Sequence, residues 1–168
     1  MMNIRPENTQ DYEAIRSLTY LAFENHPHHE PGTKPTEHLI VEKLRNTERL
    51  ALSLVAEDGE SVVGHIAFSP ITINGKASKL LALAPLSVAP KVQGKGIGSL
   101  LINRALEILK QREVDGVVLI GEPEYYSRFG FNHSPRLTFS GIPAEYFMIN
   151  SWCESIPSGE VGFDPAFG

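Results

Sequence analysis

Residues 80–111, LLALAPLSVAPKVQGKGIGSLLINRALEILKQ, decide the fold of this chain. They start as an apolar run with a proline inside it, pass through glycines at every second position from 94 to 98, and end in an amphipathic pattern. The amphipathic pattern predicts a helix over about residues 98–112. Because a second apolar run, GVVLIGE at 116–122, follows directly, we expect a strand–helix–strand crossover whose two strands are parallel.

The segments before this crossover predict an antiparallel meander. The runs ALSLVAE (51–57) and SVVGHIAFSPITI (61–73) are joined through Asp58-Gly59, which is a hairpin signal. A second such turn, Asn74-Gly75, leads into the strand at 79–88. That strand is apolar nearly throughout, as expected of a central strand that is covered on both faces.

Shorter elements are expected toward both ends. NIRP predicts a first strand, and two helices should follow, the first with Asn8 or Thr9 as N-cap and the second with Thr36 as N-cap. After the crossover, PEYYSRF predicts one or two helical turns, and GFNHSPRLTF and EYFMIN predict final strands; the tail PSGEVGFDPAFG has no clear pattern. We therefore expect one α/β (α+β) domain over residues 1–168, with helices on both faces of a mixed central sheet of about six to seven strands.

Composition narrows the class of protein. The chain has 168 residues, of which 42% are hydrophobic and 21% charged, as is ordinary for a globular domain. Its formal net charge of −5 argues against a nucleic-acid partner, which needs a basic surface. Its single cysteine, Cys153, has no internal disulfide partner, and neither an apolar leader nor a run of membrane-spanning length is present. We expect a cytoplasmic protein with no membrane partner.

Pro85 points to the site. Proline has no N–H and belongs in a strand only at an edge, a start or a bulge, yet this strand is predicted to be central. We therefore expect an interrupted ladder there, with backbone groups left free to pair with an extended, amide-bearing ligand.

The glycines after this strand predict an anion site. Gly94, Gly96 and Gly98 form a tight turn into a helix start, where unpaired N–H groups and the helix dipole favour a phosphate, and Lys91 and Lys95 add positive charge. A purely structural turn fits bare glycines about equally well. The P-loop pattern needs Lys-Ser/Thr after its last glycine, and the dinucleotide pattern needs a third glycine where Ser99 stands, so both fit poorly.

A third pattern fits better. QGKGIG (93–98) after LSVAP, followed by YYSRFGF (125–131), resembles the Q/R-x-x-G-x-G, LAVxP and FYxxxGF segments of the GNAT superfamily of N-acetyltransferases. More narrowly, residues 51–131 look like a subgroup of predicted acetyltransferases labelled YhbS-like. The resemblance implies the GNAT fold, with the parallel strand pair splayed at an acetyl-CoA site.

The resemblance also assigns residues to that cosubstrate. The pyrophosphate of acetyl-CoA would lie on the segment from Gln93 through Gly94, Lys95, Gly96, Ile97 and Gly98 to Ser99. Leu86, Ser87 and Val88 would line the pantetheine arm, with the Leu86 N–H polarising the thioester carbonyl. The implied chemistry is direct attack of a neutral primary amine, helped by proximity and by backbone donors to the oxyanion.

The resemblance also bears on the proton transfers. Tyr126 matches the family tyrosine that can protonate the leaving thiolate, Tyr125 fits that role less well, and Arg128 is either structural or phosphate-binding. The glutamate that many relatives use as general base is replaced by Ala84, so Glu122 and His65 are alternative bases. For each of these side chains an ordinary packed or solvated role remains open.

Other candidates and functions are weighed against this one. His26, His28 and His29 lie among prolines without helical metal-ligand spacing, so no metal is expected, and Cys153 lacks a catalytic histidine pattern. The leading hypothesis is an N-acetyltransferase that uses acetyl-CoA and a small-molecule or peptide amine. A noncatalytic acyl-CoA-binding or sensor module and a subunit that binds a protein partner are the alternatives. A homodimer is compatible with the sequence, which does not identify the acceptor.

Overall fold

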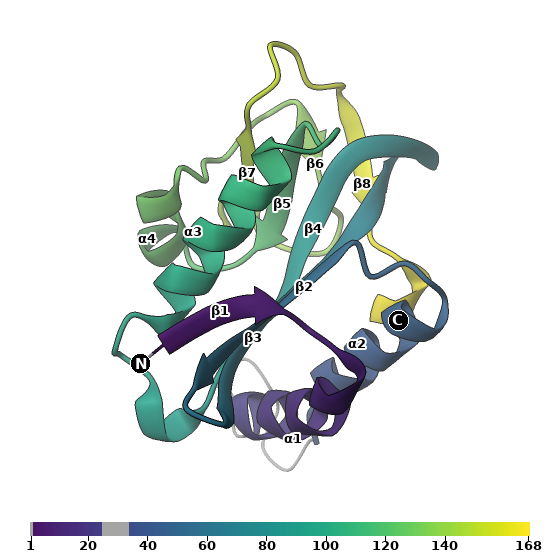
Figure 1. The fold of residues 1–168 in the computed structure, drawn as a ribbon. Helices are drawn as coiled ribbons and strands as arrows, with labels where there is room; N and C mark the ends of the chain where they lie inside the picture. Colours follow the sequence, from purple (N-terminus) through teal and green to yellow (C-terminus); the bar gives the residue numbers. More distant parts are fainter. Residues whose placement is uncertain (1, 25–33) are drawn as a thin grey trace.

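The protein is described from a computed structural model that covers residues 2–24 and 34–168 (Figure 1). The three loop histidines that were considered as metal ligands, His26, His28 and His29, lie outside these residues. Along the chain the elements are β1 (Met2–Pro6), η1 (Thr9–Asp11), α1 (Tyr12–Phe23), α2 (Glu37–Asn46), β2 (Leu52–Asp58), β3 (Ser61–Ile73), β4 (Lys76–Val88), η2 (Pro90–Val92), α3 (Ile97–Lys110), β5 (Gly116–Ile120), α4 (Pro123–Tyr126), η3 (Ser127–Phe129), β6 (Leu137–Thr138), η4 (Ala144–Tyr146), β7 (Phe147–Ser151), β8 (Gly159–Gly162) and η5 (Pro165–Phe167).

A mixed sheet organises the molecule. Its strand order is β1-β2-β3-β4-β5-β7, with β1 to β4 antiparallel, β4 and β5 parallel, and β7 antiparallel to β5. These pairings confirm the predicted meander and the parallel crossover. The sheet has eight strands rather than six to seven, because β8 in the C-terminal tail pairs with the far end of β3 and with the two-residue strand β6.

Helices cover both faces of the sheet, as predicted (Figure 1). One face packs against α3, whose Leu101, Ile102, Ala105 and Leu109 are buried with apolar residues of β2 to β5. The opposite face packs against α1 and α2 through Ile15, Val41 and Val55. No helix among residues 2–24 and 34–168 is long and apolar enough to cross a bilayer.

The first helices begin near the predicted positions, with differences at the caps. The N-cap of α1 is Asp11, rather than Asn8 or Thr9, and its side chain makes no capping hydrogen bond. Asn8 caps η1, since its Oδ1 accepts from the Gln10 amide at 2.9 Å and its own amide donates to Asp11 at 2.8 Å. Thr36 occupies the N-cap position of α2, but its side chain makes no capping hydrogen bond. The Thr36 amide instead donates to the carboxylate of Glu37 at 3.1 Å.

β4 is irregular at the predicted place. Between the pairs Phe68–Leu83 and Ile66–Leu86 the register shifts, so that Ala84 and Pro85 together stand opposite one residue of β3. This is a β-bulge, and the Ala84–Pro85 peptide is cis. The ladder between β4 and β5 covers Leu80–Ala82, whereas β4 runs on to Val88. The two parallel strands therefore separate beside the bulge.

Candidate functional site

Beyond the bulge, β4 presents backbone groups to the gap beside β5. The Ala89 amide donates to the Val63 carbonyl of β3 at 2.8 Å. Because bonding directions alternate along an antiparallel strand, the amides of Leu86 and Val88 point away from β3. The Val88 carbonyl already accepts from Gln93 Nε2 at 3.0 Å. The peptide groups of Leu86 and the Val88 N–H are thus placed to pair with an extended ligand.

The turn after η2 forms a second set of donors. Gly94 and Gly96 have φ angles of +79° and +85°, a left-handed conformation that favours glycine. Gly96 is the N-cap of α3, and its carbonyl accepts the first helical hydrogen bond, from Leu100 at 3.1 Å. The N–H groups of the turn between Gly94 and Gly96 lie before this first helical hydrogen bond, so the helix offers them no acceptor. No acidic side chain lies in the first turn of α3. This arrangement suits an anion such as a pyrophosphate.

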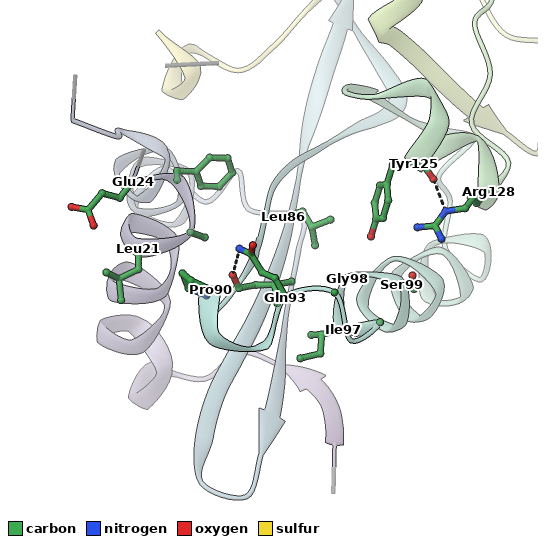
Figure 2. Close-up of a pocket in the computed structure, with 15 residues that line it drawn as sticks. Leu21, Glu24, Leu86, Pro90, Gln93, Ile97, Gly98, Ser99, Tyr125 and Arg128 are labelled. Atoms are coloured by element: carbon green, nitrogen blue, oxygen red, sulfur yellow. Dashed lines mark hydrogen bonds between the residues drawn. The ribbon is translucent and has the colours of Figure 1, made fainter. Parts of the chain in front are cut away.

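Both donor sets line one pocket of about 670 Å³, here called the glycine-loop pocket (Figure 2). The C-terminal turn of α1 closes one side of it, and Tyr125 and Arg128 close the other. Arg128 is the one basic side chain among the described residues that line it. The Arg128 guanidinium is held by the Tyr125 carbonyl at 3.2 Å and lies 4.6 Å from the centre of the Tyr125 ring.

A second pocket, of about 610 Å³, adjoins the first and is called here the aromatic pocket. Its described walls come from α1, α2, the bulge of β4, the start of α4 and three phenylalanines of the C-terminal third, Phe139, Phe163 and Phe167. The two pockets share Phe23, Leu86 and Tyr125 in their linings. Ligands in the two pockets would therefore meet beside the outward amide of Leu86.

The adjacent tyrosines lie in different surroundings. Tyr125 lines both pockets, and its hydroxyl points toward Gly98, where an added Cβ would lie 2.7 Å from it (Figure 2). Tyr126 lines the aromatic pocket and packs edge-on against Tyr125 and Phe131, with ring centres 4.9 Å and 6.1 Å away. Burial raises the pKa of Tyr126 to about 12, so this phenol stays protonated at neutral pH.

The structure gathers most of the predicted binding residues. The glycine-loop pocket is lined by Leu86, Val88, Gln93, Gly94, Gly96, Ile97, Gly98 and Ser99. Three predicted cofactor-binding residues stand apart from these, and one of them, Tyr126, lines the aromatic pocket instead. The Ser87 side chain points to the opposite face of the sheet, where it is buried. The Lys95 side chain is exposed and does not line the pocket. Any contribution of these two residues to binding would come from their backbone.

The candidate bases are placed differently from one another. Glu122 lines the aromatic pocket at the start of α4, as does Ala84 in the bulge. His65 is fully buried on the face of the sheet that carries α1 and α2, with its Nε2 2.8 Å from Ser53 Oγ, and it lines neither pocket. Burial lowers the pKa of His65 to about 4. The position of His65 therefore supports the packed, structural role and not that of a base.

Sequence reasoning missed several lining residues. Glu37, in the first turn of α2, lines the aromatic pocket together with the three phenylalanines named above. An acidic first turn is ordinary for a helix, and the phenylalanines follow no periodic pattern, so neither signal marks a site. Among the described residues, no group of three or more His, Cys, Asp or Glu could hold a metal ion.

Comparison with known proteins identifies the class and then the family. The chain falls in the acyltransferase class, because residues 3–134 match the acetyltransferase (GNAT) domain family. The chain is 32% identical over 166 residues to the Escherichia coli (strain K12) protein described as uncharacterized N-acetyltransferase YhbS, covering 96% of this chain and 93% of that protein. The chain belongs to the GNAT acetyltransferase family, as its motifs predicted.

Solved structures agree with this assignment. A GNAT family acetyltransferase from Brucella melitensis in complex with acetyl-CoA is 38% identical, with a TM-score of 0.87 over 100% of this chain and 99% of that chain. Escherichia coli YhbS in complex with CoA is 29% identical, with a TM-score of 0.88 over 99% of this chain and 91% of that chain. The predicted GNAT fold is thereby confirmed over the length of the chain.

Proposed function

We propose that this protein is an acetyl-CoA-dependent N-acetyltransferase that transfers the acetyl group directly to a primary amine. One observation carries the proposal: the glycine-loop pocket and the aromatic pocket share Leu86 and Tyr125 beside the bulge of β4. Adjoining pockets allow a bound donor and a bound acceptor to react directly, with proximity replacing the bimolecular encounter. The complexes of the Brucella melitensis relative with acetyl-CoA and of YhbS with CoA support the identity of the donor.

The residues fit this donor in two ways. The α3 N-terminus and the left-handed glycines offer N–H groups to the pyrophosphate, and Arg128 brings a positive charge to the same pocket. The open peptide groups of β4 offer strand-like partners to the amides of the pantetheine arm. Acetyl-CoA would supply the activated acetyl group as a thioester.

At the junction, the outward Leu86 N–H is proposed to stabilise negative charge on the carbonyl oxygen. The amine nitrogen forms the new C–N bond as the C–S bond breaks, and the amine must lose a proton while the sulfur gains one. We propose Tyr126 as the proton donor to sulfur, with Tyr125 as its rival because Tyr125 lines both pockets. Glu122 is the proposed base, directly or through water, since Ala84 has no ionisable group.

Two measurements test the activity. Acetyl-CoA at millimolar concentration should raise the thermal midpoint, because a ligand that binds the native state stabilises it by mass action. An amine panel should then produce amine-dependent release of CoA thiol, with the acetylated amine identified by mass spectrometry. Stabilisation without release for any amine would favour the noncatalytic acyl-CoA-binding alternative, and no stabilisation would contradict the cosubstrate assignment. The lone Cys153 supports placing the enzyme in the reducing cytoplasm.

A further inference from the structure

The aromatic pocket has a composition that selects among amines. Phe139 and Phe163 have ring centres 4.9 Å apart, and Phe163 and Phe167 have ring centres 5.2 Å apart, so the three rings form a continuous wall. Each of them is only partly buried, which leaves ring surface facing the pocket. Ile40 of α2 and Ile120 of β5 add apolar surface to the same lining. An acceptor with a hydrophobic body would remove this surface from water.

The two charged side chains in the described lining of this pocket are both acidic. Glu37 comes from α2 and Glu122 from the start of α4, and both line the cavity. Among the described residues that line it, none is a lysine, arginine or histidine. The pocket therefore attracts a cationic ammonium group and disfavours an acceptor that carries a carboxylate.

The position of the pocket fixes how such a molecule would lie. Leu86 and Tyr125 lie at its junction with the glycine-loop pocket, and Glu122 is the second residue after β5. The nitrogen of an acceptor would lie at the junction, and the rest of the molecule would pack against the three phenylalanine rings. The ammonium form is bound first, and one of the two carboxylates can then take up the proton that the nitrogen must lose before attack.

We infer that the acceptor is a primary amine on an aromatic or otherwise apolar body without a carboxylate near the amine, seated in the aromatic pocket with its nitrogen beside Leu86. The inference rests on the proposed N-acetyltransferase function, because it names the second substrate of that site. The same chemistry is offered by free arylalkylamines and by the N-terminus of a peptide that begins with an apolar residue.

The test uses matched amines and reads binding and turnover separately. Binding of 2-phenylethylamine and of ethylamine to the protein–CoA complex is measured by calorimetry, and turnover with acetyl-CoA by thiol release. Burying the phenyl group should favour 2-phenylethylamine by about 10- to 100-fold in affinity and in kcat/KM. A short peptide with N-terminal phenylalanine, assayed beside 2-phenylethylamine, distinguishes a peptide acceptor from a small one.

Variants tie the selectivity to the pocket. Phe163→Leu and Phe163→Ala should reduce the preference for 2-phenylethylamine over ethylamine progressively. The affinity for acetyl-CoA should stay unchanged, because Phe163 lines the aromatic pocket and not the glycine-loop pocket. The double variant Glu37→Gln, Glu122→Gln should reduce the preference for 2-phenylethylamine over L-phenylalanine, since removing both negative charges removes the penalty on a carboxylate. Comparing each ratio between variant and wild type cancels the intrinsic reactivity of each amine.

Three results separate this inference from the activity on which it rests. If ethylamine or another hydrophilic amine is bound and acetylated as well as 2-phenylethylamine, the acceptor class is wrong and the N-acetyltransferase function stands. Selective binding of 2-phenylethylamine without acetylation would support the ligand class and contradict the transfer. A preference that Phe163→Leu and Phe163→Ala both leave unchanged would overturn the placement in this pocket.

Discussion

His65 should make the protein sensitive to mild acid, and the size of the effect follows from its surroundings. The ring is fully buried in β3, and Ser53 Oγ, which donates to Glu7 Oε1 at 2.5 Å, can only accept from His65 Nε2. Nδ1 has no partner among the described residues. Burial lowers the pKa of His65 to about 4, with the Arg45 guanidinium acting in the same direction and the Glu7 carboxylate opposing it.

The sign of the effect is fixed by which state binds the proton. In the unfolded chain the imidazole titrates near its ordinary pKa of 6.5, whereas in the folded protein His65 stays neutral until about pH 4. Between these values the unfolded state binds more protons, so the free energy of unfolding decreases as pH falls through this window and is unaffected by His65 above it. From pH 7.5 to 4.5 the loss attributable to His65 is about 2.5 kcal/mol.

Urea denaturation at pH 7.5, 5.5 and 4.5 measures this loss, with His65→Gln as the comparison. Glutamine can still donate to Ser53 Oγ but does not titrate. Glu57, whose pKa Arg5 lowers, and His38, whose pKa burial lowers, act equally in both proteins and cancel in the difference, whereas Asp11 interacts with His65 through its charge and contributes to the difference. The wild-type curve should therefore fall about 2.5 kcal/mol further than that of the variant. Parallel curves would refute the neutral, buried assignment, and loss of turnover in a folded variant would place His65 on the proton path.

Three further changes test the site and the core. Gly96→Val should weaken acetyl-CoA binding at least about 10-fold in calorimetry, because the valine side chain would project from the turn proposed to bind the pyrophosphate. Gly59→Val is the control: it carries comparable left-handed strain but lines no pocket, so it should leave the affinity unchanged. Tyr126→Phe should lower kcat by about 100-fold with acetyl-CoA affinity retained, and Tyr125→Phe should lower it less; the reverse order would move the acid to Tyr125. Leu101→Ala, at a fully buried position of α3, should cost about 2–5 kcal/mol of unfolding free energy in urea titrations.

The parts of the fold that the sequence predicts are those with local patterns. The meander and crossover follow from alternating or continuous apolar runs separated by Asp-Gly, Asn-Gly and the glycine turn. β8 has no such signal, because its four residues are held by pairing with the end of β3, where Thr72 lies opposite Gly162. That contact joins segments far apart in the chain, and only the folded protein brings them together.

The same distinction divides the site. The glycine-loop pocket is built mainly from residues 86–99, so a contiguous motif predicts most of its lining. The aromatic pocket combines segments spread over most of the chain, namely α1, α2, the bulge, residues 120–126 and the C-terminal phenylalanines. Its acidic and aromatic character is a tertiary property, which is why the acceptor could not be inferred before the structure was known.

The bulge of β4 explains why both pockets occur at one place. Before it, Leu81 and Leu83 face the α3 side of the sheet; after it, Leu86 and Val88 pack on that side, so the one extra residue exchanges odd positions for even ones. The exchange sends the Ser87 side chain to the opposite face and turns the Leu86 amide toward the gap where β5 diverges. Pro85, which has no N–H to pair, occupies the position in the bulge where a missing donor costs least. A single insertion in one strand thus accompanies the separation of β4 from β5, turns the Leu86 amide toward the gap and leaves Ala84 lining the aromatic pocket, and the proposed site rests on these three features.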